Sequence, residues 1–278
     1  MLGPLLVSAA IAAVIAPGAL RAFAESGWTR ANFRGDRLPF PAGVVAACAA
    51  ILALGTLALA ERALDREILD GPAGSPGAWL ALWLGVAFLG LVDDLLDAHP
   101  RGWRGHARAL LGGGFDTGAL KALGTAALAF AVTAGGGAPF GEAVLSTLVI
   151  ALATNLFNLL DLRPGRAAKA WVLLAAALLL AERDAEPLRL VGVVAGPLLV
   201  LGLFDLRERC MLGDTGSNVL GALAGTWLVV ALGPAGEGVA AAVLLALTIF
   251  GEFRSISAAV DRLPPLRALD SLGRRSHA

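Results

Sequence analysis

The chain has 278 residues, of which 57% are hydrophobic and 16% are charged. Soluble proteins contain about 45–50% apolar and about 25% charged residues. This composition excludes a soluble cytosolic enzyme, a disordered chain and a nucleic-acid-binding domain. The 22 basic and 22 acidic residues cancel, so the chain has no overall field that would attract a polyanion.

The apolar residues form nine blocks, most of them close to the length that a membrane-spanning helix requires. Short connections separate the blocks, and no internal repeat or linker divides them. We therefore predict an all-α, polytopic membrane bundle of about nine transmembrane helices, with one domain over residues 1–278. Residues 252–278 are expected to form a cytoplasmic, partly amphipathic tail. The blocks are 2–22, 40–60, 78–97, 119–135, 143–162, 168–182, 188–204, 217–233 and 238–252.

The first block allows two interpretations. Ala22-Phe23-Ala24 stands at its end and resembles the small-residue site at which a signal peptide is cleaved. The start of the block is uncharged, however, and Arg21 stands on the opposite flank from a signal peptide's basic residues. A membrane helix is therefore the favoured interpretation.

Lys and Arg are divided unevenly between the two ends of the predicted helices. Eighteen of the 22 lie in the tail or in the connections that follow the first, third, fifth and seventh blocks. Basic residues concentrate on the cytoplasmic side of membrane proteins. We therefore predict a cytoplasmic (inner) membrane protein with its N-terminus outside and its C-terminus in the cytoplasm. The other four basic residues are Arg62, Arg66, Arg183 and Arg189.

Three carboxylates end the third block at this cytoplasmic face, namely Asp93, Asp94 and Asp97. Residues three or four apart share a helix face, and acids next to lipid are costly unless they meet a partner. A metal ion, a cationic side chain or a substrate could be that partner. The alternative is that the acids reach water and pair with Arg101 or Arg104.

Polar side chains recur at the ends of two further blocks. Asn155, Asn158 and Asp161 follow one another every three residues, so they share a broad helix face; hydrogen bonds between helices are the alternative use. Asp214 lies in Gly-Asp-Thr-Gly-Ser before an apolar helix. There the glycines would let backbone N–H groups approach an anion, and the carboxylate could hold a divalent cation that also touches a phosphate. A simple turn is the alternative for this motif.

Basic residues stand close to these motifs. Arg34 lies with Arg30 and Arg37 in the first cytoplasmic connection, and Lys121 begins the fourth block. Their alternative reading is that they are ordinary basic residues of the cytoplasmic side. Carboxylates, amides, glycine turns and basic groups thus converge on one face, which suits Mg²⁺ and phosphate chemistry on a lipid head group.

The order VDD-x-x-D, a Lys in the next helix, N-x-x-N-x-x-D and then GDTGS resembles the polyprenyl-phosphate N-acetylhexosamine-1-phosphate transferases. These include phospho-N-acetylmuramoyl-pentapeptide transferase and the undecaprenyl-phosphate GlcNAc-1-phosphate transferases. The similarity runs from Asn32 to about Gly221. It implies a membrane enzyme that transfers a sugar-1-phosphate from a UDP-sugar to a polyprenyl phosphate, with Mg²⁺ as cofactor and UMP as product, in cell-envelope glycan synthesis.

The resemblance also implies a role for each motif. Asp93 and Asp94 would be the catalytic pair, and Asp214 with Asn158 would serve the metal. The residues expected to bind substrate are Lys121, Asn155, Asp161, Asp97 and Arg34. The expected partners are the UDP-sugar, the polyprenyl phosphate and the lipid bilayer, with a second copy of the chain as a candidate and no nucleic acid.

Three features depart from the family pattern. The asparagine motif usually continues as D-G-x-[DN]-G, but here Asp161 is followed by Leu162-Arg163-Pro164-Gly165. The family's histidine-rich motif is replaced by a segment that carries Arg254, Arg262 and Arg267. A tenth helix has no counterpart among the nine blocks. A lipid-binding or transport protein on the same fold is therefore kept as the alternative function.

Overall fold

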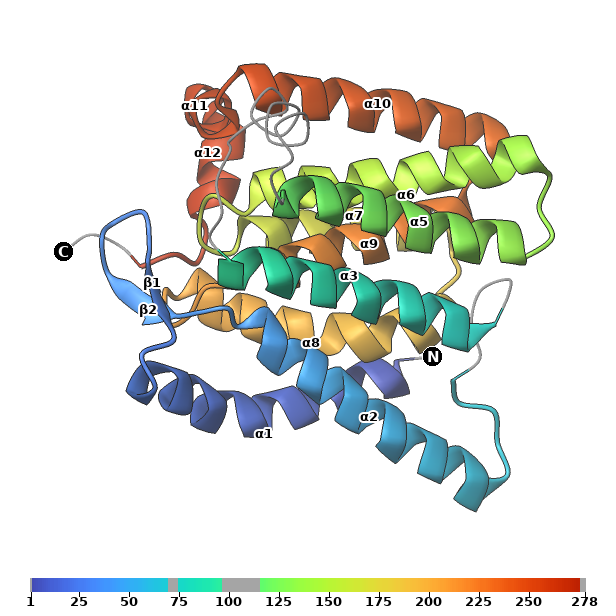
Figure 1. The fold of residues 1–278 in the computed structure, drawn as a ribbon, viewed down its shortest axis with the longest axis horizontal. Helices are drawn as coiled ribbons and strands as arrows, with labels where there is room; N and C mark the ends of the chain where they lie inside the picture. Colours follow the sequence, from blue (N-terminus) through green and yellow to red (C-terminus); the bar gives the residue numbers. More distant parts are fainter. Residues whose placement is uncertain (1, 70–74, 97–115, 276–278) are drawn as a thin grey trace.

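The computed structural model describes residues 2–69, 75–96 and 116–275. Long helices lie side by side in a bundle, and a short hairpin and two short helices gather at one end (Figure 1). We call this end of the bundle the hairpin end. The elements are α1 (Gly3–Glu25), β1 (Thr29–Ala31), β2 (Arg37–Pro39), α2 (Gly43–Leu64), α3 (Pro76–Leu96), α5 (Thr117–Gly135), α6 (Phe140–Leu160), α7 (Arg166–Glu182), α8 (Leu188–Leu206), α9 (Gly213–Ala231), α10 (Pro234–Phe253), α11 (Ile256–Arg262) and α12 (Pro264–Ser271).

Each of the nine predicted blocks corresponds to one long helix in the described part of the chain. Seven of these helices are long and apolar enough to cross a membrane, which confirms the prediction of an all-α polytopic membrane protein. The other two are α7, which has 17 residues, and α9, which begins with the polar run that contains Asp214.

Helix α9 lies inside the bundle, with α6, α3, α7, α2 and α8 packed around it. Its residues are buried almost without interruption from Gly213 to Trp227. Two glycines let α6 approach closely: a Cβ on Gly221 would lie 2.5 Å from Thr154 Cα, and one on Gly225 would lie 2.6 Å from Ile150 Cα. Small residues at such contacts let helix backbones pack tightly where no hydrophobic force draws the helices together.

The hairpin β1–β2 was not predicted from the sequence. Its two strands have three residues each and pair antiparallel, with Arg30 opposite Leu38. The side chain of Asn32 closes the turn, because its Oδ1 accepts from the backbone N–H groups of Arg34 and Asp36, both at 2.9 Å. Asparagine makes this kind of turn readily, but strands this short leave little alternation to detect in a sequence.

The segment predicted to form an amphipathic tail contains α11 and α12 in its described part. Helix α12 crosses the hairpin end of the bundle at a steep angle to the long helices (Figure 1). It exposes Leu266 and Leu269 and buries Asp270. The tail is thus attached to the bundle through a charged residue.

Replacing Gly221 with Ala tests the close packing of α9 against α6. The added methyl group would meet the backbone of Thr154 and the carbonyl oxygen of Ala153 at 2.5–2.6 Å. We expect a loss of roughly 1–3 kcal/mol of stability, as is typical of overpacking, measured by thermal unfolding in detergent. The control is Gly55→Ala in α2, where a Cβ meets nothing within 4 Å. Equal unfolding temperatures for the two variants would contradict the packing described here.

Candidate active site at the hairpin end of the bundle

The candidate site lies where α3 and α9 meet at the hairpin end of the bundle. Asp94 and Asp93 stand near the C-terminal end of α3, and Asp214 is in the first turn of α9. Helix α3 can come this close because residue 90 is glycine: a Cβ there would lie 2.5 Å from the carbonyl oxygen of Asp214. The two helices therefore bring three carboxylates into one small region.

The carboxylate of Asp94 is buried and accepts three hydrogen bonds from the start of α9. Its Oδ1 accepts from the backbone N–H of Asp214 at 2.9 Å, and its Oδ2 accepts from the N–H and the hydroxyl of Thr215 at 2.8 and 2.6 Å. The first N–H groups of a helix have no partner within the helix, and a negative charge is favourable there. Asp94 thus caps α9 from a different helix and fixes the position of Asp214.

Gly213 allows this contact to form. It has a positive φ of 72°, and a Cβ on it would meet Asp94 Oδ2 at 2.7 Å and Phe40 Cε2 at 2.8 Å. Glycine adopts positive φ without strain. Arg30 of the hairpin lies over the Phe40 ring and donates to the carbonyl oxygen of Asp94 at 3.2 Å. The hairpin is therefore joined to the same corner of the site.

Asp93, one residue earlier, has different partners from Asp94. Lys121 Nζ donates to Asp93 Oδ2 at 2.8 Å and also to Asp214 Oδ2. Asn158 Nδ2 donates to the same Asp214 oxygen at 3.1 Å. These four residues, which we call the lysine cluster, come from α3, α5, α6 and α9. Two carboxylates and one ammonium leave one formal negative charge uncompensated.

The lysine cluster is partly open to solvent. The side chains of Asp93, Lys121 and Asp214 are 21%, 15% and 26% exposed. Asp93 and Asp214 are therefore within reach of a substrate, whereas Asp94 is occupied by α9. The adjacent aspartates of the Asp-Asp pair thus serve different purposes in this fold.

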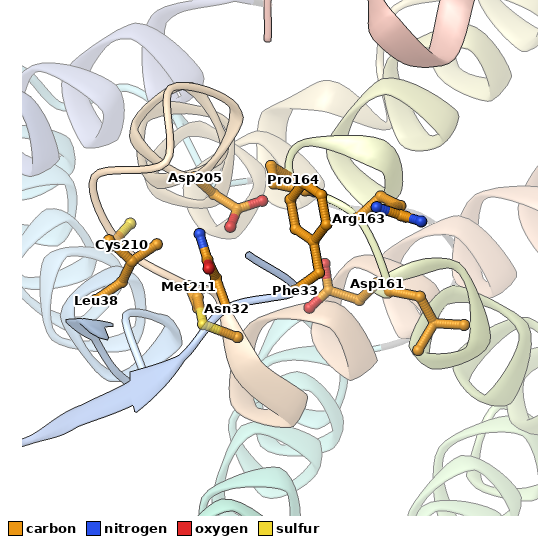
Figure 2. Close-up of a pocket in the computed structure, with 10 residues that line it drawn as sticks. Asn32, Phe33, Leu38, Asp161, Arg163, Pro164, Asp205, Cys210 and Met211 are labelled. Atoms are coloured by element: carbon orange, nitrogen blue, oxygen red, sulfur yellow. The ribbon is translucent and has the colours of Figure 1, made fainter. Parts of the chain in front are cut away.

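A pocket lies beside the cluster, between the hairpin and the turn that follows α6. Figure 2 shows the carboxylates of Asp161 and Asp205 and the amide of Asn32 among its lining groups. Burial raises the pKa of Asp161 well above its ordinary value, and repulsion from Asp205 and then Asp214 adds to this effect. The guanidinium of Arg163 stacks on the Phe33 ring at 4.4 Å, which supplies a flat cationic wall.

The C-terminal tail holds the turn that forms one side of this pocket. Arg166 makes two parallel hydrogen bonds to the Asp270 carboxylate, at 2.8 and 3.0 Å, and Arg274 makes two more, at 2.8 and 2.7 Å. Arg274 Nε also donates to the carbonyl oxygen of Pro164 at 2.9 Å. From the other side, Asp205 Oδ2 accepts from the N–H of Gly165 at 2.6 Å. We call Arg166, Asp270 and Arg274 the tail clamp.

The remaining residues predicted for the site have other surroundings. Arg34 pairs with Glu208 at 2.8 Å and donates to the carbonyl oxygen of Arg275. Asn155 is half-buried, and the structure gives its side chain no hydrogen bond among the described residues. Asp97, together with its expected alternative partners Arg101 and Arg104, lies outside the described residues.

The tail clamp and Arg30 were missed by the sequence reasoning. Asp270 and Arg274 are four residues apart, a spacing that allows an ion pair on a helix face, so half of the clamp could have been suspected. Nothing local indicates that Arg166, more than a hundred positions earlier, is the third member. Arg30 was noted only as a neighbour of Arg34, and the hairpin decides which of the two reaches Asp94.

Residues 77–232 match the protein family described as Glycosyl transferase family 4. This chain belongs to glycosyl transferase family 4. The match covers more than half of the chain and confirms the family to which the motifs pointed. It includes the lysine cluster, Asp94 and Asp161, but it excludes the hairpin and the tail clamp residues Asp270 and Arg274. A search of curated proteins gave no match.

The different partners of Asp93 and Asp94 predict different effects of the same isosteric change in this family member. Asp94→Asn would place an NH₂ group against N–H donors of α9, and hydrogen bonds to a charged group are worth about 1.5–3 kcal/mol each. We expect it to lower stability by about 2–4 kcal/mol, whereas Asp93→Asn should cost about 1 kcal/mol, because Lys121 keeps Asp214 as a partner and the two carboxylates no longer repel each other. Thermal unfolding in detergent measures both, and equal losses would contradict this assignment.

Neutralising Asp270 should release the tail. Although burial opposes ionisation, the hydrogen bonds from Arg166 and Arg274 hold the pKa of Asp270 at about 2. A shift of this size corresponds to roughly 2 kcal/mol. We expect trypsin to cleave after Arg262 and Arg267 more than tenfold faster in Asp270→Asn than in the wild type, because local opening exposes these bonds. Asp261→Asn in α11, which changes an exposed side chain, is the control.

The same pKa fixes the pH dependence of the clamp. A lowered folded-state pKa stabilises the docked tail above the ordinary aspartate pKa of about 3.9, and this contribution disappears as the pH falls through about 2. The difference between wild type and Asp270→Asn should therefore be constant from neutral pH down to about pH 5 and shrink below about pH 4. Hydrogen exchange of α12 amides would follow this change, and a difference that grows on acidification would refute the clamp.

Proposed function

We propose that the chain transfers a sugar-1-phosphate, of the N-acetylhexosamine type, from a UDP-sugar to a polyprenyl phosphate at the cytoplasmic face of the inner membrane. UMP is the second product, and the lipid-linked sugar serves cell-envelope glycan synthesis. The observation that supports this most directly is the lysine cluster, in which four helices of the family-matched region bring Asp93, Lys121, Asn158 and Asp214 together at one end of the bundle.

The donor atoms of the cluster fit Mg²⁺. Asp93 and Asp214 supply carboxylate oxygens and Asn158 an amide oxygen, which are ligands that Mg²⁺ accepts. No group of three His, Cys, Asp or Glu side chains in the described ranges could hold a metal by itself. Mg²⁺ is usually bound by one or two carboxylates, and water and substrate phosphates complete its coordination. When bound, Mg²⁺ would neutralise charge on the pyrophosphate of the donor.

The reaction joins two phosphates. An oxygen of the polyprenyl phosphate attacks the sugar-bearing phosphorus of the UDP-sugar, and the bond from that phosphorus to the bridging oxygen breaks. UMP leaves with the bridging oxygen, and the lipid gains the sugar through a new pyrophosphate bond. Since both reactants are anionic, positioning and charge compensation are the main requirements on the protein.

Within this proposal Asp93 and Lys121 act on the reacting phosphates. Asp93 is the accessible member of the Asp-Asp pair, so we assign to it the orientation of the lipid phosphate and the acceptance of any proton that the phosphate carries. The Lys121 ammonium lies between Asp93 and Asp214, where it can stabilise negative charge on a phosphate. Asp94 is a positioning residue, because it fixes the first turn of α9 and through it Asp214.

The donor nucleotide would occupy the pocket beside the cluster. The Phe33 ring and the Arg163 guanidinium offer a flat surface for a base, and Asp161 and Asn32 offer hydrogen-bonding groups. Pro164 lines this pocket where the family pattern has an acid or amide, so the set of contacts to the donor differs from that pattern. A panel of donors is therefore the informative experiment.

Release of UMP tests the function directly. Purified protein in detergent is supplied with undecaprenyl phosphate, Mg²⁺ and a series of UDP-sugars. We expect release with one donor, and we expect Asp93→Asn and Asp214→Asn to slow it by roughly 10²–10⁴-fold, as for loss of an acid–base or charge-stabilising group. Removal of the metal with a chelator should stop the reaction, and added Mg²⁺ should restore it.

The matched control for these variants is Asp65→Asn, an exposed acid after α2. Asp65 has a positive φ of 48°, a conformation that asparagine also tolerates. Wild-type turnover in Asp214→Asn would remove the role assigned to that residue. If the folded wild-type protein failed to release UMP from every donor in the series, the transferase proposal would fail. The lipid-binding or transport alternative would then take its place.

A further inference from the structure

A second cavity lies between the end of α1, the end of β2 and the end of α8, and it shares no lining residue with the pocket in Figure 2. It has a volume of about 290 Å³, which is large compared with the roughly 10–15 Å³ that holds one water molecule. Pro17 and Leu20 of α1 and Phe204 of α8 give it apolar walls, and Arg21 and Arg209 give it two guanidinium groups. The lysine cluster contributes no residue to it.

The end of α8 holds Arg209 at this cavity. Glu208 adopts a positive φ of 53°, and the N–H groups of Glu208 and Arg209 donate to the carbonyl oxygens of Asp205 and Phe204 at 2.8 and 2.9 Å. This pair of bonds is the Schellman arrangement that closes a helix C-terminus. The chain therefore turns back, and the Arg209 guanidinium lies over the Phe204 ring at 5.0 Å.

The end of α1 is closed in the same way. Gly27 has a φ of 78°, and Gly27 and Trp28 donate to the carbonyl oxygens of Ala24 and Phe23 at 3.2 and 2.8 Å. The rings of Phe23 and Trp28 pack together with their centroids 5.2 Å apart. In both helices the last carbonyl groups thus have backbone partners, and the two arginines are not needed to satisfy them.

Neither Arg21 nor Arg209 has a carboxylate within ion-pairing distance among the described residues. In the same part of the structure Arg34 pairs with Glu208, and Arg166 pairs with Asp270. Arg21 and Arg209 are exposed, and both line the same cavity. An anion in the cavity would therefore meet two guanidinium groups.

The apolar walls indicate that the anion has an apolar part. Helix α1 is long and apolar enough to span a membrane, and the cavity lies in its last turns. Trp28, which is 45% exposed, follows directly, and tryptophan concentrates at the level of lipid head groups. The two guanidiniums therefore stand at the depth of the phosphates, on the side predicted to be cytoplasmic, where membranes carry anionic lipids.

We propose that this cavity binds an anionic phospholipid of the surrounding bilayer. The phosphate would lie between Arg21 and Arg209, and the first part of an acyl chain would lie against Pro17, Leu20 and Phe204. Arg209 directly follows Glu208, which accepts from Asn32 at 3.3 Å and pairs with Arg34. A lipid held at Arg209 would thus fix the base of the hairpin.

The test compares lipids in mixed micelles with full-length protein. Dioleoyl phosphatidylglycerol and dioleoyl phosphatidylcholine are titrated separately, and bound lipid is counted by native mass spectrometry. Since a basic residue near an anionic surface contributes about a fivefold change in affinity, we expect Arg21→Gln to weaken phosphatidylglycerol binding about fivefold. Arg21→Gln combined with Arg209→Gln should weaken it about 30-fold. Phosphatidylcholine carries the same phosphate but its choline group offsets the charge, so we expect it to bind the wild type more weakly and to lose less affinity in the variants.

The control variant is Arg62→Gln combined with Arg66→Gln, which removes the same charge from the opposite end of the bundle and should retain wild-type binding. Equal phosphatidylglycerol affinity in the wild type and in the variant that combines Arg21→Gln with Arg209→Gln would overturn the proposal. Binding of glycerol 3-phosphate as tight as that of the lipid would also overturn it, because the apolar walls would then play no part. If the double variant failed to fold, Arg21→Gln alone would decide, since its side chain is exposed and lies outside the helix closure.

Discussion

The candidate site depends on one buried carboxylate that joins two helices. Asp94 is near the end of α3, yet its carboxylate accepts its three hydrogen bonds from the start of α9. Burying the Asp94 carboxylate without a partner would cost free energy, and so would burying the N–H groups at the start of α9 without acceptors. The hydrogen bonds between them offset both costs. With the N–H groups of Asp214 and Thr215 held by Asp94, the side chain of Asp214 leaves α9 in the direction of Lys121 and Asn158. The geometry of the lysine cluster therefore follows from the Asp94 contact, and Gly90 and Gly213 provide the space for it.

The region around the lysine cluster balances its charges through several elements at once. The acids Asp93, Asp161, Asp205 and Asp214 come from four helix ends, and the compensating cations are dispersed over α5, the hairpin and the turn after α6. This separation keeps carboxylates that repel one another at fixed positions without neutralising all of them. In the proposed reaction, this surplus of negative charge would attract the cation, and the nearby positive charge would attract the two phosphorylated reactants. Asp270 and Arg274 of the tail clamp lie outside the family-matched region and contribute by fixing the turn at Pro164.

The sequence indicated the helices well, because each long apolar block has few ways to satisfy its backbone in a membrane other than as a helix. It also indicated Asp93, Lys121, Asn158 and Asp214, which the structure brings into contact. It could not separate Asp93 from Asp94, since neighbouring helix residues point about 100° apart and only the packing of α9 decides which one is occupied. The hairpin was missed because three-residue strands have almost no pattern. Arg166 and Asp270 were missed because their contact spans 104 positions and depends on where α12 crosses the bundle.

The central place of α9 has a consequence for how the chain is assembled in the membrane. A helix that begins with Gly-Asp-Thr-Gly-Ser-Asn partitions poorly into lipid by itself, since polar residues reduce the free energy of insertion. In the finished bundle the side chains of this segment meet α3, α6 and their neighbours in place of acyl chains. Those partners precede α9 in the chain, so they leave the ribosome before it and are already in the bilayer when it arrives. Insertion of α9 is thereby coupled to the association of the earlier helices. A substitution in α3 that weakens its contact with α9 would therefore be expected to disturb the membrane insertion of the chain from residue 213 onward.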